Sequence, residues 1–116
     1  MKHIESHIQK NSVTWFKLQY HQLAGLLFAV PNGGARNARE AGIMKGEGVT
    51  AGVSDLILLF PVRDCGALCI EFKTETGRQT QAQKEWQKLV EYYGNKYVIC
   101  RSFDDFRKEI KDYLRF

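Results

Sequence analysis

The 116-residue sequence contains no long hydrophobic segment, because no run of about 18 uncharged apolar residues occurs in it. Its first residues, Met-Lys-His-Ile-Glu, also lack the basic-then-apolar order of a signal peptide. These absences argue against a membrane-spanning or exported protein. We therefore expect a soluble, intracellular protein.

Several familiar motifs are missing as well. The three cysteines, Cys65, Cys69 and Cys100, include no CxxC pair, which excludes a zinc ribbon or a dithiol redox site and predicts small core or hairpin residues in a reducing compartment. No GxxxxGK[ST] phosphate loop is present, so nucleoside triphosphate hydrolysis is not expected. There is no internal repeat and no low-complexity tract.

Composition indicates one ordinary globular domain over residues 1–116. Apolar residues make up 44% of the chain and aromatic residues 12%, which is enough for a single core. Trp15 and Trp86 fall at helical core spacing and are interpreted as packing residues. The net charge of +4 and the isoelectric point near 9.0 favour, modestly, a polyanionic partner.

The spacing of apolar residues and turn formers predicts the order of the elements. We expect an α/β protein with the order α-β-(α)-β-β-α-β-α. The predicted elements are a helix over residues 2–24, unbroken or interrupted near Asn11; a strand over 26–30; a short helix over 35–45; a hairpin of strands 55–60 and 67–73; a helix over 80–94; a strand over 96–100; and a last helix from Ser102.

Charged residues gather at the open end of the predicted hairpin. If its turn centres near Arg63, Asp55 faces Glu71 across the ladder, and Lys73 lies on the same face. Burying three charges beside Ile57, Leu59 and Phe72 is costly unless they pair with one another or with a cation. The alternative is a surface salt-bridge cluster at the end of a strand.

Two carboxylates and a neighbouring carbonyl suit a hard divalent cation. Mg²⁺ or Mn²⁺ binds few protein groups and keeps several waters for chemistry, so Asp55, Glu71 and the backbone carbonyl of Phe72 are the candidate ligands. Such an ion polarises a phosphoryl oxygen and lowers the pKa of water. A lysine two residues from a ligand can orient that water or stabilise the negative charge of the transition state.

Asp55 followed by Glu71-Phe72-Lys73 resembles the D…(D/E)xK signature of the PD-(D/E)xK nuclease superfamily. The flanking segments are similar to the virus-type replication-repair nuclease family, VRR-NUC. These segments are Pro31-Asn32-Gly33-Gly34, Gly52-Val53-Ser54-Asp55-Leu56, Ile70-Glu71-Phe72-Lys73, Gly77-Arg78 and Thr80-Gln81-Ala82-Gln83-Lys84-Glu85-Trp86. The resemblance covers most of the chain, and the ordered set is more specific than ExK alone.

This resemblance implies a restriction-endonuclease-like mixed sheet flanked by helices that hydrolyses phosphodiester bonds with Mg²⁺ or Mn²⁺. Asp55 and Glu71 would hold the metal, Lys73 would serve the nucleophilic water, and Gln83 would support the site from its helix. Glu5 best matches a glutamate on the family's first helix. Ser54 stands where proline commonly precedes the aspartate, a departure at a position that binds no metal.

Some of these residues have simpler explanations. Thr80 and Gln83 have the spacing of a helix capping box, so Gln83 could cap the helix, contact the site, or do both. Glu5 could be a solvated helix residue. His3 and His7 flank Glu5, but the order differs from the HExxH zinc motif, and ordinary exposed histidines are the simpler interpretation.

Four basic residues are candidates for contact with nucleic acid. Arg36, Arg39 and Lys45 surround a glycine-rich segment, and Arg78 follows Gly77. A flexible backbone with cationic side chains can follow a phosphate strand, although a solvated helix face would look the same.

The expected function is a metal-dependent, structure-selective DNA endonuclease that resembles Holliday junction resolvases, acts on branched DNA and forms a homodimer. Two alternatives stay open. One is a module of the same fold that binds nucleic acid without cutting it, and the other is a nuclease that acts on RNA. The candidate catalytic residues do not discriminate between DNA and RNA.

Overall fold

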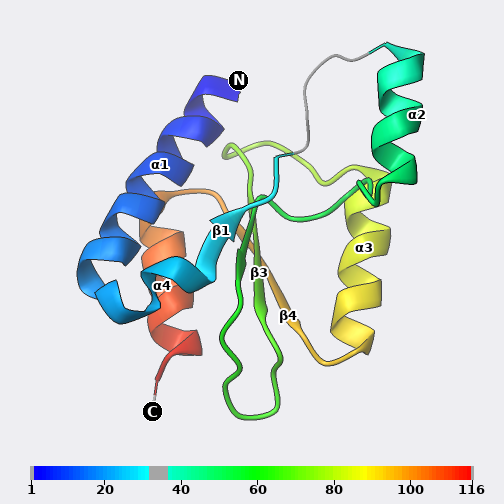
Figure 1. The fold of residues 1–116 in the computed structure, drawn as a ribbon. Coiled ribbons are helices and arrows are strands. Elements are labelled where there is room, and N and C mark those ends of the chain that lie inside the picture. Colours follow the sequence, from blue (N-terminus) through cyan, green and yellow to red (C-terminus); the bar gives the residue numbers. More distant parts are fainter. Residues whose placement is uncertain (1, 32–36, 116) are drawn as a thin grey trace.

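The computed structural model describes residues 2–31 and 37–115, and it has the α/β architecture expected from the sequence. Four strands form one mixed sheet in the order β1-β2-β3-β4, with helices on both faces (Figure 1). The elements are α1 Lys2–Gln19, a 3₁₀ helix His21–Leu26, β1 Leu27–Ala29, α2 Ala38–Gly46, β2 Leu56–Leu58, β3 Leu68–Phe72, α3 Gln81–Tyr92, β4 Lys96–Cys100 and α4 Phe103–Tyr113. None of the helices in these segments is both long and apolar enough to span a bilayer.

The β2–β3 hairpin is the centre of the sheet. Its ladder pairs Leu56 with Ile70 and Leu58 with Leu68, which is the register predicted from the sequence. Val62 and Cys65 exchange backbone hydrogen bonds of 3.0 and 2.8 Å, so a two-residue turn at Arg63-Asp64 closes the tip. β1 pairs antiparallel with β2, and β4 pairs parallel with β3.

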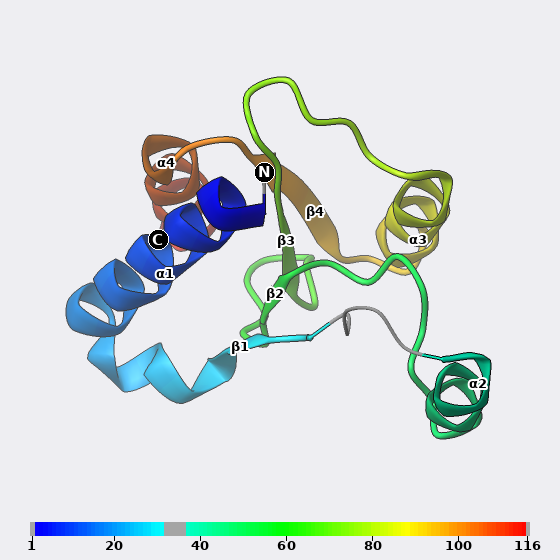
Figure 2. The same cartoon turned by 90° about the horizontal axis from the view of Figure 1, so that it is seen from above.

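The two faces of the sheet have different roles. α1 and α4 cover one face and α3 covers the other, as Figures 1 and 2 show from two directions. Because side chains alternate along a strand and cross-strand partners share a face, the even-numbered residues of β2, β3 and β4, with Leu27 and Ala29 of β1, face α1 and α4, and the alternate residues face α3. The buried core under α1 and α4 contains Phe16, Leu56, Leu58, Leu68, Ile70, Phe72, Val98, Cys100, Phe106, Ile110 and Tyr113.

Several predicted bounds were wrong. The first helix is not interrupted at Asn11, but it ends at Gln19 and not at residue 24. A 3₁₀ helix follows it and turns the chain toward β1, and the apolar residues of this segment made it look like a continuation of the first helix. α2 begins at Ala38, where the Asn37 side chain accepts a hydrogen bond from the Glu40 N–H and caps the helix. The strand predicted over 55–60 covers only 56–58, and Leu59 is 56% exposed.

The cysteines and tryptophans lie where the sequence placed them. Cys69 and Cys100 are buried, Cys65 is half-buried in the hairpin turn, and all three are free thiols. Trp15 packs against the core. Trp86 of α3 makes an edge-on contact with Tyr97 of β4, with ring centroids 6.1 Å apart.

The hairpin tip is fastened to the end of α4. The Arg63 guanidinium donates to the backbone carbonyls of Arg115, Asp112 and Tyr113 at 2.7, 3.4 and 3.0 Å. A cation at a helix C-terminus satisfies orphan carbonyls and meets the negative end of the helix dipole. The Tyr113 hydroxyl, in turn, donates to the Phe60 carbonyl at 2.7 Å. These contacts hold the hairpin at the end far from its charged residues.

The Tyr113 bond gives a test of this fastening. Tyr113→Phe keeps the buried ring but leaves the Phe60 carbonyl without its donor, so the free energy of unfolding should fall by about 1 kcal/mol. For a domain of this size that corresponds to roughly 4 °C in Tm. Thermal melts followed by circular dichroism measure it. Tyr92→Phe is the matched control, because Tyr92 is 81% exposed. Equal melting temperatures for the two variants would contradict the assignment.

Candidate active site

Asp55 is held rigidly where the chain enters β2. Its backbone carbonyl accepts from the Val30 N–H at 2.9 Å. Its side-chain Oδ2 accepts from the Phe72 N–H at 2.7 Å. The two residues that flank Asp55 are bonded to each other, because the buried Ser54 hydroxyl donates to the Leu56 carbonyl at 3.0 Å. The carboxylate is thus fixed against β3.

Glu71 lies on β3 across from Asp55, on the face toward α3. It is only 2% exposed. Its Oε2 accepts from the Gln83 amide at 2.9 Å and lies 3.8 Å from the Lys73 ammonium nitrogen. Its Oε1 is buried, and within the described segments it has no hydrogen-bond partner. A buried carboxylate oxygen without a partner is costly, so this position is suited to a ligand.

The electrostatics show that the site is short of positive charge. Burial, and then the negative charge of Asp55, raises the pKa of Glu71 to about 8, although Lys73 opposes the shift. Burial also raises the pKa of Asp55, against the lowering effect of the Phe72 N–H. Two carboxyl groups this close do not both ionise readily, so the pair either shares a proton or takes a cation beside it.

The structure answers the question about Gln83, since the residue both caps α3 and reaches the site. Its Oε1 accepts from the Thr80 N–H at 2.8 Å, while the Thr80 hydroxyl accepts from the Gln83 N–H at 3.1 Å, which completes the capping box. Because the amide oxygen is engaged in the cap, the amide nitrogen is directed to Glu71. The cap therefore orients the group that binds the carboxylate.

Glu5 lies at the same end of the molecule. It is half-buried near the start of α1, and its negative charge raises the pKa of both Asp55 and Glu71, which places it within electrostatic range of them. Figure 1 shows the N-terminal end of α1 beside the loop that follows β3. The solvated-helix interpretation of Glu5 is therefore incomplete.

The residues present fit a divalent cation. The Phe72 N–H points to Asp55 on the β2 side, and in a strand the carbonyl of the same residue points the same way. Asp55, Glu71 and this carbonyl offer hard oxygen ligands, and the partnerless Oε1 is one of them. Within residues 2–31 and 37–115, no three His, Cys, Asp or Glu side chains gather. An ion here would keep several waters, as Mg²⁺ and Mn²⁺ do.

Comparison with known proteins decides the family. The family model of the VRR-NUC domain matches residues 3–104. The chain belongs to the VRR-NUC family. A solved structure named "VRR_NUC domain protein" is similar in fold, with a TM-score of 0.84 and 27% sequence identity over 96% of this chain and 88% of the other. No functionally curated protein matches. VRR-NUC domains are nucleases of the PD-(D/E)xK superfamily, which generally use divalent metals and bind nucleic acid.

The basic residues predicted to contact nucleic acid are spread over the VRR-NUC domain. Arg78 is exposed in the loop that leads from β3 to α3, close in sequence to Lys73. Arg39 and Lys45 are exposed on α2, which contributes no buried residue and lies on the same side of the molecule as α3 (Figures 1 and 2). Arg36 lies outside the described residues. The structure thus brings Asp55, Glu71, Lys73 and Gln83 together but sets the α2 cations apart from them.

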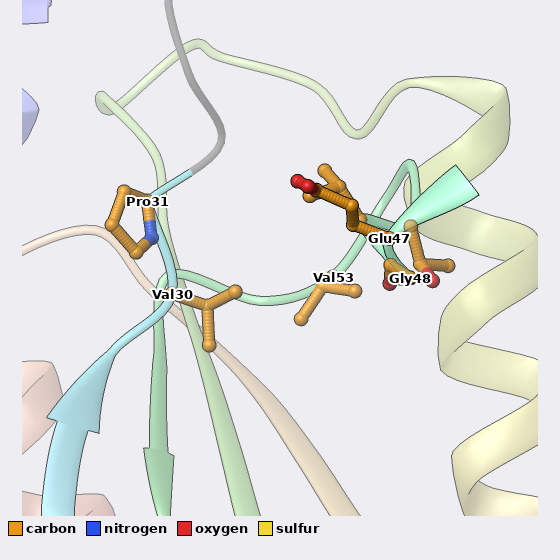
Figure 3. Close-up of a pocket in the computed structure, with 7 residues that line it drawn as sticks. Val30, Pro31, Glu47, Gly48 and Val53 are labelled. Atoms are coloured by element: carbon orange, nitrogen blue, oxygen red, sulfur yellow. Dashed lines mark hydrogen bonds between the residues drawn. The ribbon is translucent and has the colours of Figure 1, made fainter. Parts of the chain in front are cut away.

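A cavity of about 350 Å³ opens beside this site. Figure 3 shows Val30 and Pro31 on one side and Glu47, Gly48 and Val53 on the other. Its wall adjoins the site through Val30, whose N–H donates to the Asp55 carbonyl. Neither Asp55 nor Glu71 lines it, so the cavity neighbours the carboxylates without containing them.

Gly52 is a structural requirement that sequence reasoning did not identify. It has φ +86°, and a Cβ there would lie 2.2 Å from the Ala82 carbonyl oxygen and 2.9 Å from the Gln83 nitrogen. The loop that delivers Asp55 therefore presses directly on the first turn of α3. Its only sequence signal was its position in the Gly-x-x-Asp segment.

The raised pKa of Glu71 predicts an unusual pH dependence of stability in the absence of metal. Native Glu71 holds a proton up to about pH 8, whereas an unfolded glutamate releases it near 4.5, so this group makes stability fall as pH rises between these values. Glu71→Gln removes the effect and should melt at least about 4 °C above the natural protein at pH 8.5 in EDTA, with little difference at pH 4.5.

Thermal melts from pH 4.5 to 9 measure this difference, and Glu75→Gln, at an exposed position, controls for the change in net charge. A Glu71→Gln variant that is less stable than the natural protein at pH 8.5 would contradict the raised pKa of Glu71.

The close approach at Gly52 gives a second prediction. Gly52→Ala should destabilise the domain by about 2 kcal/mol or more, because the residue is strained at this φ and its methyl group meets backbone. Gly42→Ala is the matched control: its Cβ meets nothing within 4 Å in a helix, so it should stabilise by about 0.5–1 kcal/mol. Urea titrations measure both, and changes of the same sign would refute the packing argument.

Proposed function

We propose that this VRR-NUC protein is a Mg²⁺- or Mn²⁺-dependent, structure-selective DNA endonuclease, similar to Holliday junction resolvases in acting on branched DNA. The observation that carries the proposal is the pair formed by the half-buried Asp55 and the buried Glu71. One of its oxygens lacks a partner, and the only ammonium group beside it, in the described part of the chain, is that of Lys73. Structure alone gives little reason to bury such a pair.

Each residue of the proposed site has a role that its contacts support. Asp55, fixed by the Phe72 N–H, and Glu71, fixed by Gln83, would hold the ion together with the Phe72 carbonyl. When bound, the ion polarises a phosphoryl oxygen and lowers the pKa of water. Lys73, itself only 9% exposed, would orient the attacking water or stabilise the charge on the phosphoryl group.

Gln83 and Glu5 would act around this centre. Gln83 keeps Glu71 in place through an amide that the capping box orients. Glu5 adds a third negative charge within range of the pair and would take part through water or through the ion.

The substrate and the assembly follow from charge and size. A basic chain of net charge +4 suits a polyanion, and Arg39, Lys45, Arg78 and Arg36 are the proposed nucleic-acid contacts. A single nuclease domain over residues 1–116 offers little surface to hold a junction alone, so we favour a homodimer that cuts two symmetric strands. We propose the cytoplasm of a bacterium or phage-infected host as its place of action.

Substitution of the site residues tests the activity. Lys73→Ala and Asp55→Asn should each lower the cleavage rate by at least about 100-fold with the fold retained, because each removes a group needed at the phosphoryl centre. Lys108→Ala, at an exposed position of α4, is the control and should cut like the natural protein. Cleavage of labelled four-way junction, flap, duplex and single-stranded DNA, with and without Mg²⁺ or Mn²⁺, is read on a denaturing gel.

The same gel separates the alternatives. Normal cutting by Lys73→Ala would refute the site. Salt-sensitive binding with no metal-dependent product would identify a module that binds without cutting. Faster cleavage of an RNA strand of the same sequence would identify an RNA nuclease.

A further inference from the structure

Arg101 directly follows the last residue of β4, next to Lys73, which directly follows the last residue of β3. The parallel ladder of β3 and β4 ends with Phe72 opposite Cys100, and the Lys73 N–H donates to the Cys100 carbonyl at 3.1 Å. Lys73 and Arg101 are therefore the next pair in register. Adjacent strand residues in register share a face. A second cation thus lies one strand beyond Lys73, on the side away from Asp55.

The Arg101 guanidinium is held in place by a turn. Its Nη1 donates to the carbonyls of Thr74 and Gly77 at 2.8 and 2.6 Å, and to that of Glu75 at 3.4 Å. The turn itself closes through the Gly77 N–H, which donates to the Thr74 carbonyl at 3.1 Å. The side chain is therefore oriented before any ligand arrives.

The positive charge of Arg101 is not neutralised. Asp105 accepts from the Arg101 backbone N–H, not from the guanidinium. No carboxylate in the described ranges lies within ion-pair distance of this half-buried group. Arg63 also donates to three carbonyls, but these belong to the end of α4, where the helix dipole supplies negative charge. The turn at Thr74–Gly77 supplies no such dipole.

We propose that Arg101 binds a backbone phosphate of the nucleic acid next to the one at Lys73. Among the described residues only Nη1 donates hydrogen bonds to protein, so Nη2 and Nε keep N–H groups for a ligand, and a guanidinium presents such groups in the fork that matches phosphate oxygens. The unneutralised charge and the fixed orientation both favour an anion there. The proposal rests on the proposed nuclease function, because it takes its phosphate from that substrate.

Binding measured apart from cleavage tests the proposal. Fluorescence anisotropy with labelled single-stranded DNA in excess EDTA, over 50–300 mM salt, should show that Arg101→Gln weakens binding by about tenfold and lowers the salt slope by about 0.7. Arg63→Gln is the matched control, since it loses the same charge and a similar set of carbonyl contacts at the far end of the hairpin. It should leave the salt slope unchanged.

Arg101→Lys keeps the positive charge but lacks the paired N–H donors of the guanidinium, so it should retain the salt slope of the natural protein and bind with intermediate affinity. This variant also tests the proposal if Arg101→Gln does not fold. A slope for Arg101→Lys as low as for Arg101→Gln, or no change in either, would overturn the proposal. Lost cleavage with unchanged binding would overturn it too and leave Arg101 as a brace for the turn. Failure of the natural protein to cut with any metal would instead refute the proposed function.

Discussion

The arrangement of this protein depends on one pairing, that of Asp55 with Glu71 across the hairpin ladder. Burial removes the hydration of Glu71, and the neighbouring charge of Asp55 repels it, so that the pKa of Glu71 rises to about 8. The surrounding contacts offset only part of this cost. The Phe72 N–H holds one acid, Gln83 holds the other, and Lys73 supplies a single positive charge at 3.8 Å. A divalent ion would supply the positive charge that is still missing.

The rest of the fold holds that pairing in place. The core of β2 and β3 against α1 and α4 fixes the strand register, and Arg63 and Tyr113 fasten the far end of the hairpin to α4. On the other face, α3 brings Gln83 to Glu71, at a spacing set by the contact of Gly52 with Ala82. A shift in either layer would move one carboxylate relative to the other.

Much of the site could be predicted from the sequence, because a hairpin couples sequence distance to spatial distance. Once the turn at Arg63 was located, Asp55, Glu71 and Lys73 had to share a face. The mixed sheet was less accessible: local patterns do not say that β4 pairs parallel with β3, and that expectation came from family resemblance. The end of the first helix was missed because Leu23 continues its apolar spacing past Gln19, where the chain turns into the 3₁₀ helix.

Contacts made to backbone were the hardest to foresee. Gly52 meets a carbonyl of α3, and Arg101 binds three carbonyls of a turn. A carbonyl belongs to every residue type, so the partner leaves no mark in the sequence. Gln83 was ambiguous for a related reason: its spacing from Thr80 explained it fully as a cap, and nothing local revealed that the amide nitrogen had a second use.

That double use of one amide restricts how the domain can change. Glutamate serves as well as glutamine in a capping box, since either offers an oxygen to the Thr80 N–H. At position 83, however, glutamate would present its other oxygen to Glu71 and add a fourth negative charge to a site already poor in cations. A substitution that is neutral for the helix would thus be harmful for the proposed chemistry. Searches for thermostable variants by surface redesign should leave this position alone, although by its place on the helix it looks freely exchangeable.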